Sequence, residues 1–376
     1  MDCYLDNSAT TKPCKSCVEA VVSALTNDWG NPSSIHQIGV NSFSLLENCR
    51  KIIADSLKSE TSEIYFTPSG TISNNTAIFG AVNLLKRRGN KIVTTAFEHP
   101  SVQKCMDKLL NDGFEVVRIQ PQKDGNISVK DFEKVIDENT ILVSLMSVNH
   151  EVGSILPFES IKKIIKQKGS PALLHVDNIQ GYLKIPVTPK LTGIDLLSVS
   201  AHKIHGPKGA GALYINKNVK IKPYILGGGQ ESGICSGTQG LPAIAGFAAA
   251  VSDFGNSAEN FKKVEALNLR FKKQIKNLDG VLLNSPENAL PYIINISLEK
   301  IPSQVSVNYF SMNGVFLSAG SACSKGHRSE VLEAMELMPD RIDSALRISL
   351  SHNTTSEEID RCVEIIKSAI LQLRKK

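Results

Sequence analysis

The stretch Leu196-Leu197-Ser198-Val199 is a short, continuous apolar run, and Ser200-Ala201-His202-Lys203 follows it directly. Runs that are continuous rather than alternating are typical of strands covered on both faces of a parallel sheet. Polar residues that follow such a run lie where the strand ends. We therefore predict a buried strand over 196–199, with Lys203 just beyond its carboxyl end.

Five runs of the same kind precede this one in the chain. They are Glu63-Ile64-Tyr65-Phe66, Lys91-Ile92-Val93-Thr94, Phe114-Glu115-Val116-Val117, Ile141-Leu142-Val143-Ser144-Leu145 and Leu173-Leu174-His175-Val176. Helical patterns lie between them, over 76–86, 102–110 and 158–166. Alternation of strand and helix is the pattern of a mostly parallel sheet. The sequence therefore predicts an α/β fold.

The pattern changes after Gly227-Gly228-Gly229 and the Ala- and Gly-rich stretch over 243–250. Beyond it we expect a long amphipathic helix over 262–275, then short strands and further helices. Thr355-Ser356-Glu357-Glu358 has the form of a capping box that opens the last helix. We place the boundary near residue 255. The prediction is a large α/β domain over 15–255 and a smaller α+β domain made of 1–14 and 256–376.

Composition places the chain among ordinary globular proteins. It has 376 residues, 41% of them hydrophobic and 21% charged, and a formal net charge of +5. Lys and Arg are scattered except at Arg374-Lys375-Lys376, so we expect no direct contact with nucleic acid. The first residues lack the pattern of a secretory signal, and no apolar stretch reaches the roughly 20 residues of a membrane span. We expect a cytoplasmic protein that does not enter a membrane.

Eight cysteines are spread along the chain, and in such a protein they indicate free thiols rather than a disulfide framework. Cys14 and Cys17 form the one close pair. No second pair or His-x-x-x-His motif completes a zinc site, so we expect no metal. A structural role at the start of a helix is the favoured interpretation, with a redox or metal role as the alternative.

Ligands of open α/β sheets bind beyond the carboxyl ends of the strands. The polar residues that follow the predicted strands are therefore the candidates for a functional site. They are Thr67 to Asn75, Glu98-His99, Asn149-His150-Glu151, Asp177 to Gln180 and Ser200 to Lys203. We expect these five segments to meet in one cleft.

Three of these segments fit a pyridoxal 5'-phosphate (PLP) site. A partly desolvated lysine such as Lys203 loses its proton readily and suits Schiff-base chemistry, although a lone lysine is more often a surface residue. A carboxylate at a strand end, such as Asp177, keeps a pyridine nitrogen protonated, although turn aspartates are equally common. The loop over 67–75 leads into a helix whose N-terminus suits phosphate, although such loops also serve as plain caps.

At these residues the chain resembles the cysteine desulfurases of the class V aminotransferase group. Nine motifs occur in the order seen in that family and cover nearly the whole chain. They are Tyr4 to Thr11, Thr67 to Asn75, Glu98-His99, Val148 to Gly153, His175-Val176-Asp177, Ser200 to Gly209, Ser236-Gly237-Thr238, Gly320 to Cys323 and Arg347 to Leu350. The resemblance implies PLP-dependent fold type I, with a mostly parallel seven-stranded sheet in the large domain.

The resemblance also implies a role for each matching residue. Catalysis falls to Lys203, Cys323 and His99. The cofactor is attached covalently to Lys203, its pyridine nitrogen faces Asp177, and its ring stacks on His99. Its phenolic oxygen faces Gln180 and His150. Its phosphate is held by Thr71, Ser200 and His202, and by Thr238 from the neighbouring subunit of a homodimer. The substrate is bound by Arg347 and Asn149, where a guanidinium suits a carboxylate.

The implied reaction is removal of sulfur from L-cysteine. Cys323 is the nucleophile of the family, and its polar, basic surroundings favour a thiolate. The products are L-alanine and a persulfide on the enzyme. The persulfide then passes to an acceptor protein, such as an iron-sulfur scaffold or a tRNA-thiolation enzyme.

Three residues depart from the commonest family pattern. His150 stands where an asparagine is usual, Ile72 replaces a glutamate and Cys235 replaces an arginine. These departures keep other functions open: a selenocysteine lyase, another class V aminotransferase, or a low-activity paralogue that binds partners in sulfur trafficking. Cys323 discriminates among them, because transamination needs no thiol. Cys235 as a second sulfur-handling thiol is a further hypothesis.

Overall fold

A seven-stranded sheet forms the centre of the protein, in a computed structural model that describes residues 2–319 and 328–374. Its order is β2 (Ile64–Thr67), β8 (Gly211–Ile215), β7 (Leu196–Ser200), β6 (Leu173–Asp177), β5 (Thr140–Met146), β3 (Lys91–Thr95) and β4 (Glu115–Ile119). From β7 to β4 all neighbours are parallel, whereas β8 is antiparallel to both β7 and β2. The predicted α/β fold and all six predicted strands are confirmed.

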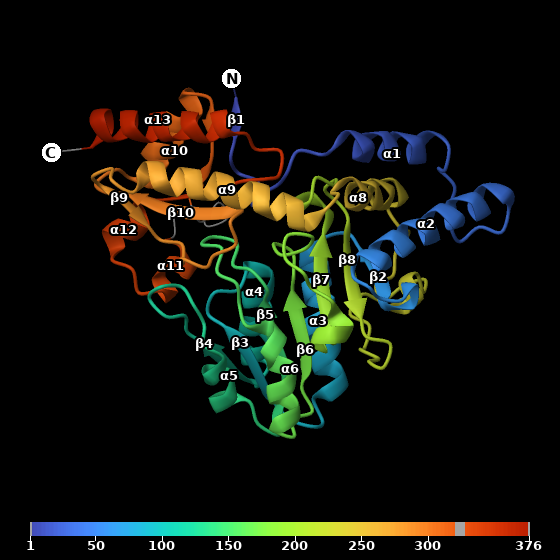
Figure 1. Ribbon diagram of the computed structural model, residues 1–376. Coiled ribbons are helices and arrows are strands. Elements are labelled where there is room, and N and C mark those ends of the chain that lie inside the picture. The colour runs from blue at the N-terminus through green and yellow to red at the C-terminus, as the bar shows by residue number, and fades with distance from the viewer. Residues whose placement is uncertain (1, 320–327, 375–376) are drawn as a thin grey trace.

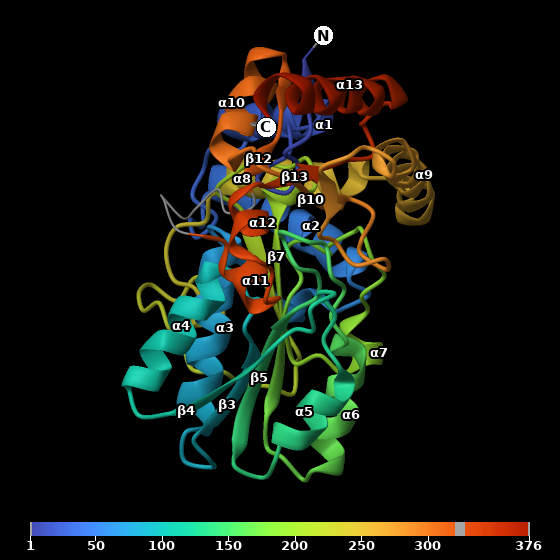
Figure 2. The same ribbon diagram turned by 90° about the vertical axis from the view of Figure 1, so that its left-hand side faces the viewer.

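Helices cover both faces of this sheet, which is why its strands are apolar throughout. In Figure 2, α3 (Gly70–Leu85) and α4 (Pro100–Asn111) lie on one side, and α5 (Val129–Val135), α6 (Phe158–Gln167) and α7 (Pro189–Thr192) lie on the other. Every residue of β5 is buried. Three more helices, α1 (Lys15–Thr26), α2 (Gln37–Ser56) and α8 (Leu241–Asp253), pack together beyond β8 (Figure 1). Short 3-10 turns lie at η1 (Thr61–Glu63), η2 (Ala201–Lys203) and η3 (Glu231–Gly233).

A second, antiparallel sheet lies above the first in Figure 1. Its order is β12 (Ser318–Ala319), β13 (Ala345–Ser349), β10 (Ile293–Leu298) and β9 (Val281–Leu283). The helices of this part are α9 (Ser257–Ile275), α10 (Ser303–Met312), α11 (Glu330–Ala334), α12 (Pro339–Asp343) and α13 (Ser356–Leu373). The chain start joins it, because β1 (Cys3–Tyr4) pairs in parallel with β11 (Val315–Phe316).

The buried apolar residues follow this arrangement. One core cluster combines Cys3 and Leu5 with Phe271, Phe310 and Ile366, so the first residues share a core with the C-terminal part. The residues of this cluster favour the predicted division into one domain over 15–255 and another made of 1–14 and 256–376. The division itself stays a prediction. Over residues 2–319 and 328–374, no helix has the length and apolar character needed to cross a membrane.

The predicted capping box of the last helix is present. Thr355 is the N-cap of α13, and its hydroxyl oxygen accepts a hydrogen bond from the Glu358 backbone N–H at 3.3 Å. In return, the Glu358 carboxylate accepts the Thr355 N–H at 2.9 Å. This reciprocal pair satisfies two N–H groups that the helix leaves without internal partners.

We expect Thr355→Ala to lower the free energy of unfolding by about 1 kcal/mol, because the helix loses its cap. Chemical denaturation followed by circular dichroism measures this loss. Ser356→Ala is the matched control, since the Ser356 hydroxyl donates to the neighbouring Glu357 side chain at 3.2 Å rather than to the helix backbone. Equal losses in the two variants would contradict the capping role.

Candidate active site

The carboxyl ends of five strands meet at one edge of the central sheet. Strands β5, β6 and β7 all point toward the second sheet in Figure 1, and β3 and β2 run the same way by their pairing. The five polar segments predicted to converge follow these strands. Polar side chains are therefore concentrated between the two sheets.

Lys203 lies in η2, immediately after β7, and its amine faces the chain start. Its Nζ donates hydrogen bonds to the backbone oxygen of Ser8 at 2.5 Å and to that of Ala9 at 2.8 Å. The same segment is fixed by the Thr11 N–H, which donates to the His202 oxygen at 2.9 Å. The N-terminal segment thus orients the lysine, a role that sequence reasoning missed although Tyr4 to Thr11 formed one of the motifs.

Asp177 ends β6 as a buried carboxylate with two donors. Its Oδ2 accepts the Asn74 side-chain amide at 2.7 Å, and its Oδ1 accepts the Ile179 N–H at 3.0 Å. Burial raises the pKa of Asp177, while these donors and the charge of Lys203 act in the opposite direction. A positive group bound against Asp177 would stabilise the ionised carboxylate further.

A hydrogen-bonded chain connects Asp177 to His99. The Asn74 amide also donates to the Ser101 hydroxyl at 2.9 Å, and that hydroxyl lies 2.9 Å from Nδ1 of His99. Asn74 and Ser101 were not predicted as site residues. The position of Asn74 in the motif over 67–75 was the one signal for it, whereas Ser101 is recognised only from the helix start that it shares with His99.

His99 is the N-cap of α4, and its ring is held in one protonation state. The Ser101 backbone N–H donates to Nδ1 at 3.1 Å, so that nitrogen carries no proton. Burial, with smaller effects from the charges of Lys203 and Arg347, lowers the pKa of His99 to about 4. The ring is therefore neutral near pH 7, with its one proton on Nε2.

His150 lies beside His99, with the two ring centroids 5.3 Å apart and the rings inclined by 72°. Burial lowers the pKa of His150 well below its ordinary value. Its Nδ1 has no hydrogen-bond partner within residues 2–319 and 328–374. A neutral imidazole with an unused nitrogen can serve a bound ligand in place of the usual asparagine.

Arg347 reaches the same space from β13 in the second sheet. Its Nη1 donates to the His150 oxygen and its Nη2 to the Asp6 carboxylate, both at 3.0 Å. Its Nε is buried and has no partner in the described part of the chain. The guanidinium is thus fixed in place while one donor stays available for a carboxylate.

Two further predicted residues are held mainly by the backbone. The Gln180 amide nitrogen donates to the Ser8 oxygen at 3.0 Å, and its buried Oε1 has no partner among the described residues. The Asn149 oxygen accepts the N–H groups of Glu151 and Val152 at 2.8 and 2.9 Å. Its amide donates to the Phe97 oxygen at 3.1 Å. Asn149 therefore shapes the turn after β5.

The predicted phosphate residues lie at the start of α3 and after β7. Thr71 is exposed in the first turn of α3, which Ser69 caps, while Ser200 is buried at the end of β7. An ideal Cβ on Gly70 would lie 2.2 Å from Cδ1 of Ile179, so this helix start lies close against the Ile179 side chain of the loop after β6. His202 Nδ1 lies 3.3 Å from the Thr10 hydroxyl.

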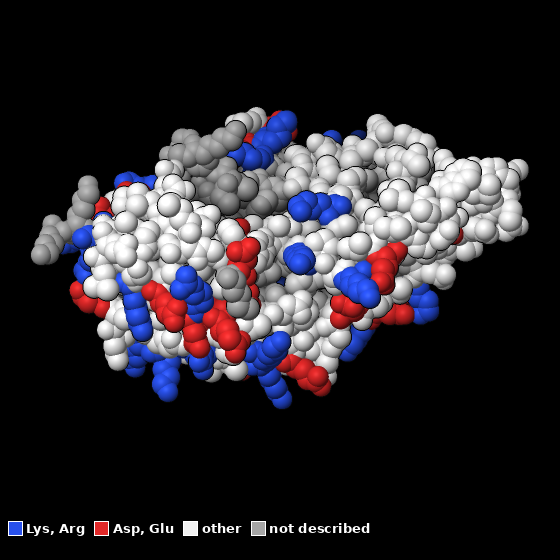
Figure 3. Space-filling view, turned by 90° about the horizontal axis from the view of Figure 1, so that it is seen from above, with Lys and Arg blue, Asp and Glu red and all other residues white. Residues whose placement is uncertain are grey.

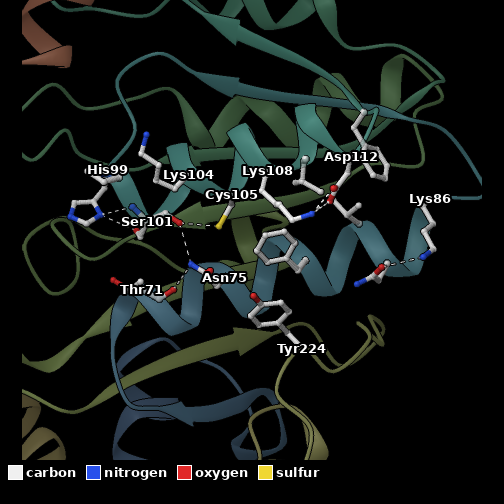
Figure 4. A pocket seen from close by; sticks show the side chains of 16 residues that line it. Thr71, Asn75, Lys86, His99, Ser101, Lys104, Cys105, Lys108, Asp112 and Tyr224 are labelled. Atoms are coloured by element: carbon white, nitrogen blue, oxygen red, sulfur yellow. Dashed lines mark hydrogen bonds and ion pairs between the residues drawn. The ribbon is translucent and has the colours of Figure 1, made fainter.

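A groove of about 880 Å³ runs outward from this point between α3 and α4. In Figure 4, Thr71, Asn75, His99 and Ser101 lie at one end and Lys86 and Asp112 at the other. The Asn75 amide donates to the Thr71 oxygen at 2.9 Å and to the Ser101 oxygen at 3.2 Å, which ties the two helix starts together. The groove thus opens directly at the candidate phosphate site.

Three further predicted or suspected residues are not among the contacts described above. Cys323 falls outside the described residues. Thr238 is exposed on the connection between β8 and α8. Cys235 is 6% exposed, and burial raises the pKa of its thiol, which works against a thiolate there. Among the described residues, no group of His, Cys, Asp and Glu side chains is placed to hold a metal ion.

The residues present fit PLP. A buried carboxylate near the Lys203 charge, a His150 ring nitrogen with no partner among the described residues and the helix start at Gly70 match a pyridine nitrogen, the ring oxygen and the phosphate in turn, and the Lys203 amine matches the aldehyde. The neutral His99 ring offers a flat face for the cofactor ring.

Comparisons with known proteins identify the family that the chain resembles. The family model described as aminotransferase class-V matches residues 3–362. A protein named cysteine desulfurase IscS from Methanosarcina thermophila is 36% identical, with 99% of this chain and 92% of that protein covered. A NifS/IcsS protein homolog from Lactobacillus delbrueckii subsp. bulgaricus is 38% identical, with 96% and 95% covered.

Solved structures of similar proteins share the fold of this chain. One described as a NifS-like protein has a TM-score of 0.93 and 35% identity, and the match covers 99% of this chain and 100% of that one. SspA in complex with cysteine has a TM-score of 0.83 and 31% identity, covering 94% and 100%. The likeness therefore spans both sheets and the space between them.

Glu98, next to His99, gives the site a pH dependence. Its carboxylate is buried against the Thr95 hydroxyl at 2.5 Å, and burial raises its pKa from 4.5 to about 8. The folded protein thus keeps a proton that the unfolded chain loses, so this contribution to stability is lost as pH rises toward 8.

We expect Glu98→Gln to reduce the fall in melting temperature between pH 6 and pH 8, measured on cofactor-free protein. Burial also raises the pKa of Glu151, to about 7, so the fall becomes smaller rather than vanishing. Glu159→Gln, at an exposed position on α6, is the control and should leave the fall unchanged. An unchanged fall in Glu98→Gln would contradict a buried, protonated Glu98.

Proposed function

The chain belongs to the aminotransferase class-V family, and from that premise we propose that it is a PLP-dependent cysteine desulfurase. It takes sulfur from L-cysteine, releases L-alanine and keeps the sulfur as a persulfide on Cys323. The observation that carries this proposal is the chain of hydrogen bonds from Asp177 through Asn74 and Ser101 to His99, with Lys203 and Arg347 around it.

The residues divide the work of holding the cofactor. Lys203 would attach it, Asp177 would face the pyridine nitrogen, Gln180 and His150 would face the ring oxygen, and His99 would lie against the ring. Thr71, Ser200 and His202 would hold the phosphate. When bound, PLP stores the electron pair that the substrate carbon releases when it loses its proton.

Substrate binding and proton transfer fall to Arg347 and Lys203. The Arg347 guanidinium binds the cysteine carboxylate, with its free Nε as one donor, and so fixes which bond of the α-carbon faces the lysine. The Lys203 amine would accept the α-proton. The Ser8 and Ala9 oxygens keep that amine within reach.

Sulfur transfer falls to Cys323. Its thiolate attacks the substrate sulfur, the carbon–sulfur bond breaks, and the bonding electron pair leaves with the carbon. That carbon takes up a proton, and alanine forms. The enzyme thiolate and the transferred sulfur together make the persulfide, so no external oxidant is needed.

We expect wild-type protein with PLP and L-cysteine to release alanine, and Cys323→Ala to abolish this release while still binding PLP. Alanine formation and the cofactor absorption band measure the two properties separately. Cys235→Ser is the control and should retain alanine release, because the Cys235 thiol is buried and its pKa is raised. Full activity in Cys323→Ala would contradict the proposal.

We further propose that the active protein is a homodimer. An apolar surface supports this: Val18, Val22 and Leu25 share one face of α1, and all three are exposed. Trp29 is 66% and Ile35 98% exposed on the connection to α2. Figure 3 shows this right-hand end of the molecule almost free of charged side chains. Exposed apolar surfaces of this kind are typical of protein–protein interfaces. A second copy is the occupant that fits, because the family resemblance has Thr238 reach the cofactor phosphate of the neighbouring subunit, and Thr238 is exposed.

Mixing of two inactive variants tests the shared site. In a dimer of Lys203→Ala and Thr238→Ala subunits, one site combines an intact Lys203 with an intact Thr238. We expect the mixture, after subunit exchange at limiting PLP, to recover about a quarter of wild-type activity by random reassortment. No recovery despite proven exchange would show that Thr238 does not act across the subunit interface.

The sulfur acceptor belongs to the same proposal. A persulfide passes its outer sulfur to another thiolate, so the partner is a protein with an accessible cysteine. An iron-sulfur scaffold or a tRNA-thiolation enzyme in the cytoplasm has this chemistry.

A further inference from the structure

The connection that carries Thr238 is anchored by a buried carboxylate. Glu231 lies in η3 between β8 and α8 and is only 6% exposed. Its backbone φ is 50° and that of Ser232 is 53°, a left-handed conformation that non-glycine residues adopt at a cost. Such a conformation persists where surrounding contacts enforce it, which directs attention to the partners of Glu231.

Four donors surround the Glu231 carboxylate. Arg50 binds it through two parallel bonds, Nη1 to Oε2 at 2.7 Å and Nη2 to Oε1 at 3.0 Å. The Phe66 N–H donates to Oε2 at 2.8 Å, and the Gln239 amide donates to Oε1 at 3.0 Å. A buried ion pair needs this degree of satisfaction to offset the loss of water around both charges. Both carboxylate oxygens are thus fully used.

These bonds fix the chain on both sides of Thr238. On one side, the Gly237 N–H donates to the Gln230 side-chain oxygen at 3.0 Å, next to Glu231. On the other side, Gln239 is bound to Glu231 itself. Thr238 is exposed between these two anchored neighbours. Thr238 is therefore an exposed residue on an anchored backbone.

The same ion pair reaches the phosphate segment of its own subunit. Arg50 also donates from Nη1 to the Ile64 oxygen at 2.8 Å, and its guanidinium lies 4.9 Å from the Phe66 ring centroid. Ile64 and Phe66 belong to β2, which leads through Thr67 into the start of α3 with Thr71. The Arg50–Glu231 pair thus contacts the residues that lead into both segments expected to bind phosphate.

Packing alone does not hold the connection. A cavity of about 530 Å³ borders Gly228, Gln230 and Ser232 on one side and Phe43 and Arg50 on the other. Side chains therefore leave this flank of the connection open. The polar contacts of Glu231 therefore determine the backbone conformation of the connection.

We propose that the Arg50–Glu231 pair positions Thr238 for the cofactor phosphate of the neighbouring subunit, while it fixes the strand that leads to Thr71 in its own subunit. Glu231 and Arg50 are positioning residues, since neither touches the cofactor. The inference rests on the proposed PLP-dependent homodimer. It adds to that proposal a residue pair that does not contact the reacting atoms but whose removal weakens phosphate binding.

The test compares two bidentate pairs. Arg50→Lys replaces the guanidinium by a single ammonium, and Glu231→Gln places an amide group against Arg50. Arg270→Lys is the matched control, because Arg270 binds Asp360 through two bonds of 2.8 and 2.6 Å at the exposed face between α9 and α13. The readouts are the dissociation constant of PLP, titrated by absorption without L-cysteine, and the melting temperature of cofactor-free protein.

We expect Glu231→Gln and Arg50→Lys to weaken PLP binding at least about tenfold, since charge-assisted bonds of this kind are among the strong ones. Arg270→Lys should change it less than about twofold, as exposed pairs contribute little. At saturating PLP, the KM for L-cysteine should stay unchanged in both Arg50→Lys and Glu231→Gln. A lower melting temperature with unchanged PLP affinity would overturn the proposal, because the pair would then be structural only.

A double variant separates positioning from general loosening. If Glu231 acts through Thr238, adding Glu231→Gln to Thr238→Ala weakens PLP binding by much less than it does in the wild type. Full additivity of the two effects would overturn the proposal. PLP is titrated without substrate, so the two proposals can fail separately. If the wild type binds PLP but releases no alanine, only the proposed function is contradicted. If Glu231→Gln or Arg50→Lys is active and binds PLP as the wild type does, only this inference is contradicted.

Discussion

The hydrogen bond from the Asn74 amide to the Asp177 carboxylate, 2.7 Å long, joins α3 to the end of β6 in a place that water does not reach. Burial alone raises the pKa of Asp177 and favours its neutral form. The amide, the Ile179 N–H and the nearby Lys203 charge favour the ionised form instead. A cofactor with a protonated ring nitrogen completes this balance. The buried carboxylate would be balanced by such a ring nitrogen, and it would in turn keep that nitrogen protonated, the state in which the ring accepts electrons.

The sheet was predictable from the sequence because both of its faces are covered. Strands such as 141–145 and 196–199 had to be apolar throughout, so they stood out as continuous runs, and the polar residues after them had to gather at one edge. Lys203, Asp177 and His99 were found in this way. The antiparallel strand β8 follows the lysine motif without a helix between, and it was not identified individually. Helices α1 and α2 were missed as full elements, because their exposed apolar residues blur the amphipathic pattern.

Other parts of the site depend on contacts between distant segments, which no local pattern records. The Ser8 and Ala9 oxygens meet Lys203 only because β1 pairs with β11 and brings the chain start across the cleft. Arg50 meets Glu231 across 181 positions. Neither residue carried a signal beyond its ordinary helix or loop setting. Of the departures from the family pattern, His150 lies beside His99 within the site, whereas Cys235 is buried on the connection between β8 and α8.

The central claim is that this chain moves sulfur from cysteine onto Cys323. Peptide mass spectrometry of the PLP-loaded protein, after brief exposure to L-cysteine and alkylation of thiols, tests it most directly. The account predicts that the peptide with Cys323 gains the mass of one sulfur atom and that peptides with the other seven cysteines do not. No added sulfur on Cys323, in protein that forms alanine from L-cysteine, would contradict it.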